Sequence, residues 1–327
     1  MARTKFHFVD DYRALVRNLI AQYPLPEAMS RAVGGSYDAL GEVEKQLLIH
    51  AGLEPHHVLL DVGCGSGRLA KALVPYLTQG QFLGTDVVQE LLAFAKDGCP
   101  PHWLWAVVED VSIPLPPDSV DFAAFFSVFT HLLHEETYCY LIEAQRVVRP
   151  GGKIVFLFLE FEHNWDIFDA TAATIRAGRT NVHLNTFIGR DAIRIWSEKL
   201  GFTILEIRDG PERFIPLSRP VVYDDGTRVE GLAAMGHRSA SFATTGRRHE
   251  EAGAGGKAQR DEAAHRCEAR SREIARCSKT ARRRETAHRR ETRRAHARAR
   301  SRHHARLARA SRHESDPRRH GALRHRR

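Results

Sequence analysis

Three glycines at alternating positions follow a short apolar segment and form the part of the sequence best suited to bind a ligand. The segment starts at Val58 and ends at Asp61 and Val62. Gly63, Gly65 and Gly67 follow it and precede an amphipathic run. Without Cβ atoms, glycines let the main chain turn sharply and touch a ligand, while the N–H groups of a following helix face its negative group. The sequence therefore predicts a loop that binds a nucleotide-like molecule.

The spacing of these glycines separates two classes of nucleotide-binding protein. The dinucleotide fingerprint requires a third glycine at position 68, where this chain has arginine, so an NAD(P)-dependent oxidoreductase is the disfavoured alternative. The pattern Asp-x-Gly-x-Gly-x-Gly over residues 61–67 instead resembles motif I of the class I S-adenosylmethionine-dependent methyltransferases. This resemblance implies S-adenosylmethionine as the cofactor, with its amino acid carboxylate against the loop.

Further motifs follow in the order of that family, and the resemblance covers about residues 30–236. Asp86 ends the second expected strand, where its carboxylate could accept both ribose hydroxyls, although a helix cap is the alternative. The resemblance implies that Asp110, beside Val111, contacts the exocyclic amine of adenine; a surface turn is the alternative. It also places Ser127, in the loop after the fourth expected strand, beside the sulfonium.

The resemblance implies in-line displacement by an acceptor nucleophile on the cofactor's methyl group. Alignment and exclusion of water can supply most of the rate enhancement, so a dedicated base is optional. His131 and His134 are the candidates, because histidine removes protons near neutral pH. His131 lies nearer the expected cofactor, whereas His134 could simply lie at a helix start. The acceptor's identity stays open; a small apolar or aromatic molecule is favoured by the aromatic residues near the expected site.

Short apolar segments alternate with amphipathic ones after residue 58, which predicts an α/β fold with a Rossmann-like, doubly wound, mostly parallel sheet of seven strands. Strands are expected over residues 58–62, 81–86, 102–108, 120–126, 153–161 and 202–208, with helices over 67–77, 89–97, 135–148 and 190–200. Residues 1–53 form an N-terminal helical cap and residues 54–236 the cofactor-binding domain. A further helix over residues 165–176 could roof the site, and simple packing is the equal alternative.

The formal charge of +9 averages two different segments. Residues 1–236 carry 21 Lys and Arg against 30 Asp and Glu, whereas residues 237–327 carry 28 against 10. The acidic body argues against nucleic acid as its substrate, since binding to phosphate backbones needs basic side chains. Five scattered cysteines indicate neither a disulfide framework nor a metal site, and no apolar run is long enough to predict a membrane span. We expect a cytoplasmic protein; its oligomeric state is left open.

Residues 237–327 lose apolar periodicity and are predicted to be a disordered Arg/Ala/His-rich tail. One interpretation is an arm that binds nucleic acid, on a body that binds the cofactor without catalysis. The other, which we favour, is an out-of-frame reading of GC-rich DNA. An apolar closing strand is expected directly after Gly236, yet His-Arg-Ser-Ala-Ser-Phe follows, and Arg outnumbers Lys by 26 to 2 in the tail. On this interpretation the last strand of the sheet is incomplete.

Overall fold

A sheet of seven strands forms the centre of the protein in the computed structural model, which describes residues 6, 8–178, 185–235 and 241–247. The strand order is β3-β2-β1-β4-β5-β11-β6, and all pairs are parallel except the two that involve β11. The strands are β1 (Val58–Val62), β2 (Gln81–Asp86), β3 (Leu104–Val107), β4 (Val120–Phe125), β5 (Val148–Phe158), β6 (Phe202–Arg208) and β11 (Ser241–Arg247). The predicted doubly wound, mostly parallel fold is confirmed.

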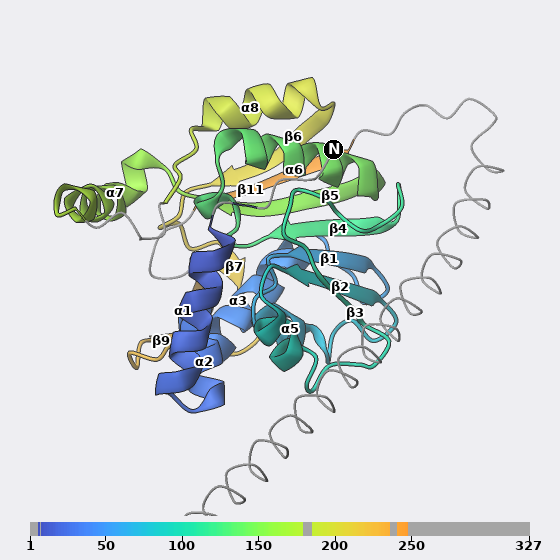
Figure 1. Ribbon diagram of the computed structural model, residues 1–327. Coiled ribbons are helices and arrows are strands. Elements are labelled where there is room, and N and C mark those ends of the chain that lie inside the picture. The colour runs from blue at the N-terminus through green and yellow to red at the C-terminus, as the bar shows by residue number, and fades with distance from the viewer. Residues whose placement is uncertain (1–5, 7, 179–184, 236–240, 248–327) are drawn as a thin grey trace, which may run out of the picture. The chain divides into compact units, whose positions relative to one another are not determined.

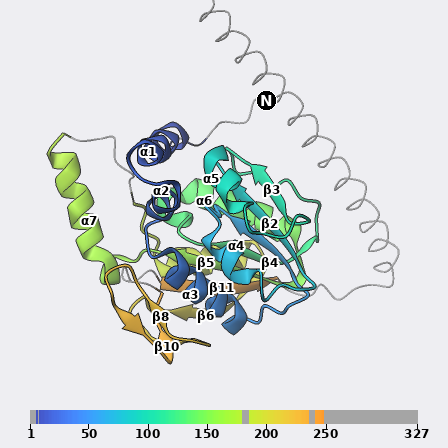
Figure 2. The same cartoon turned by 90° about the horizontal axis from the view of Figure 1, so that it is seen from below.

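Helices cover both faces of this sheet, because its central strands are apolar on both sides. On one face lie α6 (His134–Val147) and α8 (Arg190–Lys199). On the other lie α3 (Tyr37–His50) and α4 (Arg68–Leu73), as Figures 1 and 2 show. The helix α5 (Gln89–Ala95) follows β2. Leu59 and Leu60, adjacent in β1, point into the two separate cores, and both are fully buried.

The last strand of the sheet lies inside the segment predicted to be a disordered tail. β11 runs between β5 and β6 and pairs antiparallel with both, so that prediction is wrong for residues 241–247. The reason is that the edges of β5 and β6 each present N–H and C=O groups, and a backbone ladder can satisfy them without an apolar sequence. The sheet is complete in the frame as it stands, which removes the missing strand as an argument for an out-of-frame tail. Residues 237–240 and 248–327 lie outside the described part.

Three additions surround one end of the sheet. The first is a helical pair before α3, α1 (Val9–Gln22) and α2 (Leu25–Ala32), which confirms the predicted N-terminal helices. The second is α7 (Phe161–Arg176), which projects away from the sheet in both views (Figures 1 and 2). The third is a pair of short antiparallel ribbons between β6 and β11, packed on α3: β7 (Ile215–Pro216) with β10 (Leu232–Ala233), and β8 (Val221–Val222) with β9 (Arg228–Val229). None of the helices in the described part combines the length and apolar character that crossing a bilayer needs.

Candidate functional site

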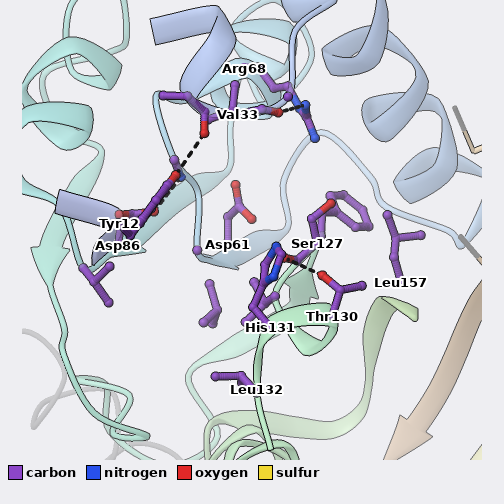
Figure 3. A pocket seen from close by; sticks show the side chains of 18 of the residues that line it. Tyr12, Val33, Asp61, Arg68, Asp86, Ser127, Thr130, His131, Leu132 and Leu157 are labelled. Atoms are coloured by element: carbon purple, nitrogen blue, oxygen red, sulfur yellow. Dashed lines mark hydrogen bonds between the residues drawn. The ribbon is translucent and has the colours of Figure 1, made fainter. Parts of the chain in front are cut away.

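A cavity of about 480 Å³ lies where the chain leaves β1, β2 and β4 (Figure 3). In a doubly wound sheet this is the point where the strand order reverses, and ligands bind beyond the carboxyl ends of the strands there. The cavity is lined by segments from α1, the α2–α3 loop, the glycine loop, the β4–α6 loop, β5, α7 and the ribbon insertion. Of the predicted site residues it brings together Asp61, Gly63, Gly65, Asp86, Ser127 and His131.

The glycine loop has a main chain that only glycine adopts easily. Gly63 has φ +69° and Gly65 has φ +54°, both in the left-handed region. A Cβ on Gly63 would lie 2.5 Å from Cγ2 of Val128, and one on Gly65 would lie 2.5 Å from Cγ1 of Val33. Both positions therefore need glycine for conformation and for space, and both expose backbone to the cavity.

The third glycine and Ser127 have different roles. Gly67 does not line the cavity; it is the residue before α4, where a Cβ would meet Ala95 of α5 at 2.6 Å, so it allows α4 and α5 to pack closely. Ser127 lines the cavity and has φ +57°, an uncommon conformation for a residue with a side chain. Its carbonyl accepts a hydrogen bond from Oγ1 of Thr130 at 3.1 Å, which fixes the turn after β4.

Asp86 links β2 to the glycine loop. Its Oδ2 accepts the N–H of Gly65 at 3.0 Å, and its Oδ1 accepts the N–H of Val88, the residue before α5, at 2.8 Å. Asp86 therefore lines the cavity and holds the residue before α5, without capping the helix itself. Its contact with a ribose stays a prediction. Burial raises the pKa of Asp86 to about 6, although the N–H donors oppose this shift.

Asp61 belongs to a group of buried charges at the start of the loop. Glu44 of α3 accepts two hydrogen bonds from the guanidinium of Arg68, one of them from Nε at 2.9 Å, and Arg68 also donates to the carbonyl of Val33 at 2.7 Å. Burial, together with the charges of Glu44 and Asp86, raises the pKa of Asp61 well above its ordinary value. Glu44 was not among the predicted site residues. The available signal was a carboxylate among the apolar residues of an otherwise core-facing helix.

The N-terminal helix α1 forms a wall of the cavity. Figure 3 shows Tyr12 beside Asp86, and the hydroxyl of Tyr12 donates to the carbonyl of Ala32 at 3.2 Å. Arg13 donates to the carbonyl of Val87 at 2.8 Å and pairs with Glu109. Neither Tyr12 nor Arg13 was predicted as a site residue, because only the fold brings α1 to the ends of β2 and β3.

The two predicted histidines lie in different surroundings. His131 lines the cavity, on the same side as Ser127 and Thr130 in Figure 3. His134 begins α6 outside the cavity lining, where Nε2 lies 2.9 Å from the carbonyl oxygen of Phe187 and the ring packs edge-on against Trp196. His134 thus has the helix-start position given as its alternative, and its ring ties α6 to a neighbouring segment. For both histidines a catalytic role stays a prediction.

The predicted adenine contacts also lie outside the cavity lining. Oδ1 of Asp110 accepts the N–H of Ser112 at 2.8 Å, and its carbonyl accepts the hydroxyl of Tyr140 at 3.1 Å. Val111 packs against the main apolar core. This geometry is the surface turn that we gave as the alternative, and contact of either residue with a ligand stays a prediction.

Apolar side chains form another part of the cavity wall, and Figure 3 shows one of them, Leu157, on the opposite side from Asp86. Phe126, Leu157 and Leu159 come from β4, β5 and the residues that follow them, and all three are buried. Ile167 of α7 and Met235, which follows the ribbon insertion, also line this part. Such walls exclude water and favour an apolar molecule over a charged one.

The family model of the methyltransferase domain matches residues 60–156, from β1 to near the end of β5. The ubiquinone/menaquinone biosynthesis C-methyltransferase UbiE of Cupriavidus taiwanensis is 31% identical over 122 residues, which are 36% of this chain and 49% of that protein. The malonyl-(acyl-carrier protein) O-methyltransferase of Methylococcus capsulatus is 27% identical over 189 residues, 54% of this chain and 64% of that protein. The chain thus spans about half the length of the first of these relatives.

Among solved structures, the complex between the Trm112 methyltransferase activator of Haloferax volcanii and a methyltransferase contains a similar chain. The TM-score is 0.50 at 17% identity, with 75% of this chain and 99% of the other covered, which supports the fold alone. The family match starts in β1 and includes the glycine loop and Asp86, the residues that line the cavity at the ends of β1 and β2. Residues 60–156 therefore match the methyltransferase domain family, and the strand order of the sheet agrees with that likeness.

Proposed function

We propose that this protein transfers a methyl group from S-adenosylmethionine to a small-molecule acceptor. The observation that carries the proposal is the cradle formed by Gly63, Gly65 and Asp86. A Cβ at either glycine would clash with a neighbouring side chain, and the carboxylate at the end of β2 faces the same cavity.

The charges of the cavity support this ligand over a dinucleotide. Its lining includes the carboxylates of Glu44, Asp61 and Asp86 against one guanidinium, that of Arg68. S-adenosylmethionine carries a sulfonium and an ammonium group against one carboxylate, and its net positive charge would offset part of the surplus of buried acid. A pyrophosphate would instead bring further negative charge toward the carboxylates, which is a physical reason to disfavour NAD(P).

Each part of the cavity has a role in the proposed reaction. The bound cofactor supplies an electrophilic methyl group at its sulfonium. Backbone groups of Gly63 and Gly65 would hold its amino acid end, and Asp86 would accept hydrogen bonds from the ribose hydroxyls. Phe126 and Leu157 would exclude water from the apolar part, and His131, which lines the cavity, would accept a proton from the acceptor.

The acceptor is proposed to be a small molecule. The acidic body disfavours nucleic acid, and the apolar walls suit an organic molecule that reaches the cavity. The two curated relatives described above are named for quinone biosynthesis and for a malonyl group on a carrier protein. Neither name is transferred to this chain, because the matched segments cover only part of each protein.

Calorimetric titration of the purified protein with S-adenosylmethionine, NAD and a short RNA tests the proposal. We expect S-adenosylmethionine to bind and NAD to be at least tenfold weaker. Incubation with labelled cofactor and fractionated metabolites then identifies the methylated product. A folded protein that binds NAD but does not bind S-adenosylmethionine contradicts the proposal.

A further inference from the structure

Helix α7 carries aromatic side chains that the fold leaves in solvent. Trp165 is 59% exposed and Phe161 is 50% exposed. Their rings contact Phe168 at centroid distances of 5.0 and 5.2 Å, and Phe161 stacks on Phe187 at 4.8 Å. We call these four residues the aromatic patch. Phe187 is buried and Phe168 half-buried, so Phe161 and Trp165 form the exposed part of the patch. Exposed apolar surface commonly marks a site of interaction.

The aromatic patch adjoins the apolar part of the cavity wall, which includes Leu159 and Ile167. Phe187 forms a backbone bridge with Leu159, which lines the cavity, and Ile167, which also lines it, directly precedes Phe168. Across the cavity, α1 contributes Leu15, which is 41% exposed. The cavity wall on α7 is therefore continuous with the patch.

Polar contacts hold the start of α7 in place. Glu160, just before the helix, accepts hydrogen bonds from Arg190 at 2.8 and 2.9 Å. The buried side chain of Asn164 accepts the N–H of Glu160 at 3.0 Å, and Asn164 itself has a non-helical backbone. These contacts hold the first turn of α7, which carries Phe161, beside the cavity, so a ligand would meet that ring preformed.

The charges on α7 restrict what can bind there. Glu162, Asp166 and Asp169 are exposed on the same helix as the aromatic rings, with Arg176 paired to Asp169 at 3.7 Å. Like charge repels an anionic membrane, a nucleic acid or an acidic carrier protein. A charged ligand group would also lose hydration against the rings and the apolar walls. The surface suits an uncharged, lipophilic small molecule.

We propose that the aromatic patch binds the apolar part of an uncharged, lipophilic methyl acceptor, whose reacting group enters the cavity between α1 and α7. This rests on the proposed function, since it names the class of acceptor for the same site. The patch would contribute to the affinity for the acceptor and leave cofactor binding unchanged.

Two fluorescent dyes with the same ring system test the proposal with the full-length protein. N-phenyl-1-naphthylamine is uncharged, and 1-anilinonaphthalene-8-sulfonate carries a sulfonate. We expect the neutral dye to bind at least tenfold more tightly, and Trp165→Ser or Phe161→Ser to weaken it about tenfold. The matched control, Ile195→Ser, replaces an equally exposed apolar residue (54%) on α8 and should leave dye affinity unchanged. Circular dichroism verifies that each variant is folded.

The readouts separate this proposal from the proposed function. Calorimetry with S-adenosylmethionine alone reports on the cofactor site. If the wild-type protein does not bind S-adenosylmethionine, the proposed function is contradicted, whatever the dye affinities are. Equal dye affinity in wild type and both patch variants overturns the aromatic patch as a binding site, as does equal affinity for the two dyes. Sedimentation with neutral phosphatidylcholine vesicles, or dimerisation in light scattering that Trp165→Ser abolishes, overturns it in favour of a membrane surface or a second copy.

Discussion

The Asp86→Asn variant keeps the shape of the side chain and removes its negative charge. In the folded protein the pKa of Asp86 is raised from its ordinary value of 3.8 to about 6, chiefly by burial. The folded state therefore binds this proton more tightly than the unfolded chain does. The stability contribution of Asp86 is greatest below pH 3.8, falls as pH rises toward about 6, and is constant above that.

This shift sets the expected change in stability. Raising the pKa of Asp86 from 3.8 to about 6 lowers the free energy of unfolding at pH 8 by on the order of 3 kcal/mol, at about 1.4 kcal/mol per pKa unit. Asparagine removes that cost, but its amide can accept only one of the N–H groups of Gly65 and Val88, a loss of about 1–3 kcal/mol. We therefore expect the free energy of unfolding of Asp86→Asn at pH 8 to be unchanged or up to about 2 kcal/mol higher. Urea denaturation measures it.

Cofactor binding should respond in the opposite direction. Losing one charge-assisted hydrogen bond to a ribose hydroxyl costs about 1.5–3 kcal/mol, which is roughly a 10- to 150-fold weaker Kd for S-adenosylmethionine. In wild type, protonation of Asp86 should weaken binding about tenfold between pH 8 and pH 5. The variant should lack this part of the pH dependence. If folded Asp86→Asn binds within twofold of wild type at pH 8, the carboxylate does not hold the ribose and the site is misplaced.

Three further perturbations test other parts of the structure. Gly65→Ala should weaken S-adenosylmethionine binding more than tenfold, because its Cβ would lie 2.5 Å from Val33. The control Gly98→Ala, where nothing lies within 4 Å of the added Cβ, should lower only the free energy of unfolding, by about 1 kcal/mol. Titration and urea denaturation compare the two variants, and equal cofactor affinity would contradict the cradle. His131→Ala should lower kcat and leave the Kd of the cofactor unchanged. His134→Ala should lower the free energy of unfolding by about 1 kcal/mol and leave kcat unchanged. If rate assays show a lower kcat only for His134→Ala, the roles expected of the two histidines are refuted. A chain that ends after Arg247 should have the same melting temperature as the full chain. A chain that also lacks β11 should unfold cooperatively at a temperature more than 10 °C lower, because β5 and β6 each lose a hydrogen-bonded neighbour. Equal melting temperatures of the two truncated chains in circular dichroism would contradict this.

Local patterns made much of the fold predictable. The ends of β1, β2 and β6 coincide with the predicted ranges, because each is a short apolar run bounded by turn residues. The strand at residues 153–161 was placed too late, since β5 starts at Val148 directly after α6. Residues 149–152 of β5 bulge out of register with β4, since Val148 pairs with Val120 and Lys153 with Phe122, and Gly151 has φ +82° there.

The closing strand shows where such patterns fail. The sequence after Gly236 lacks the alternation of an apolar strand, so these residues were predicted to be disordered and the last strand of the sheet incomplete. Its position is determined by two neighbours, β5 and β6, that are far away in the chain and need backbone partners.

By itself, the sequence determined the glycine loop, the acid at the end of β2 and the order of strands and helices. These follow from local backbone preference and periodicity, which neighbouring residues decide. Only the tertiary structure decided that Glu44 pairs with Arg68, that His131 rather than His134 lines the cavity, and that the rings of α7 adjoin it. Each of these depends on how distant segments pack, and no local pattern specifies the direction in which a side chain then points.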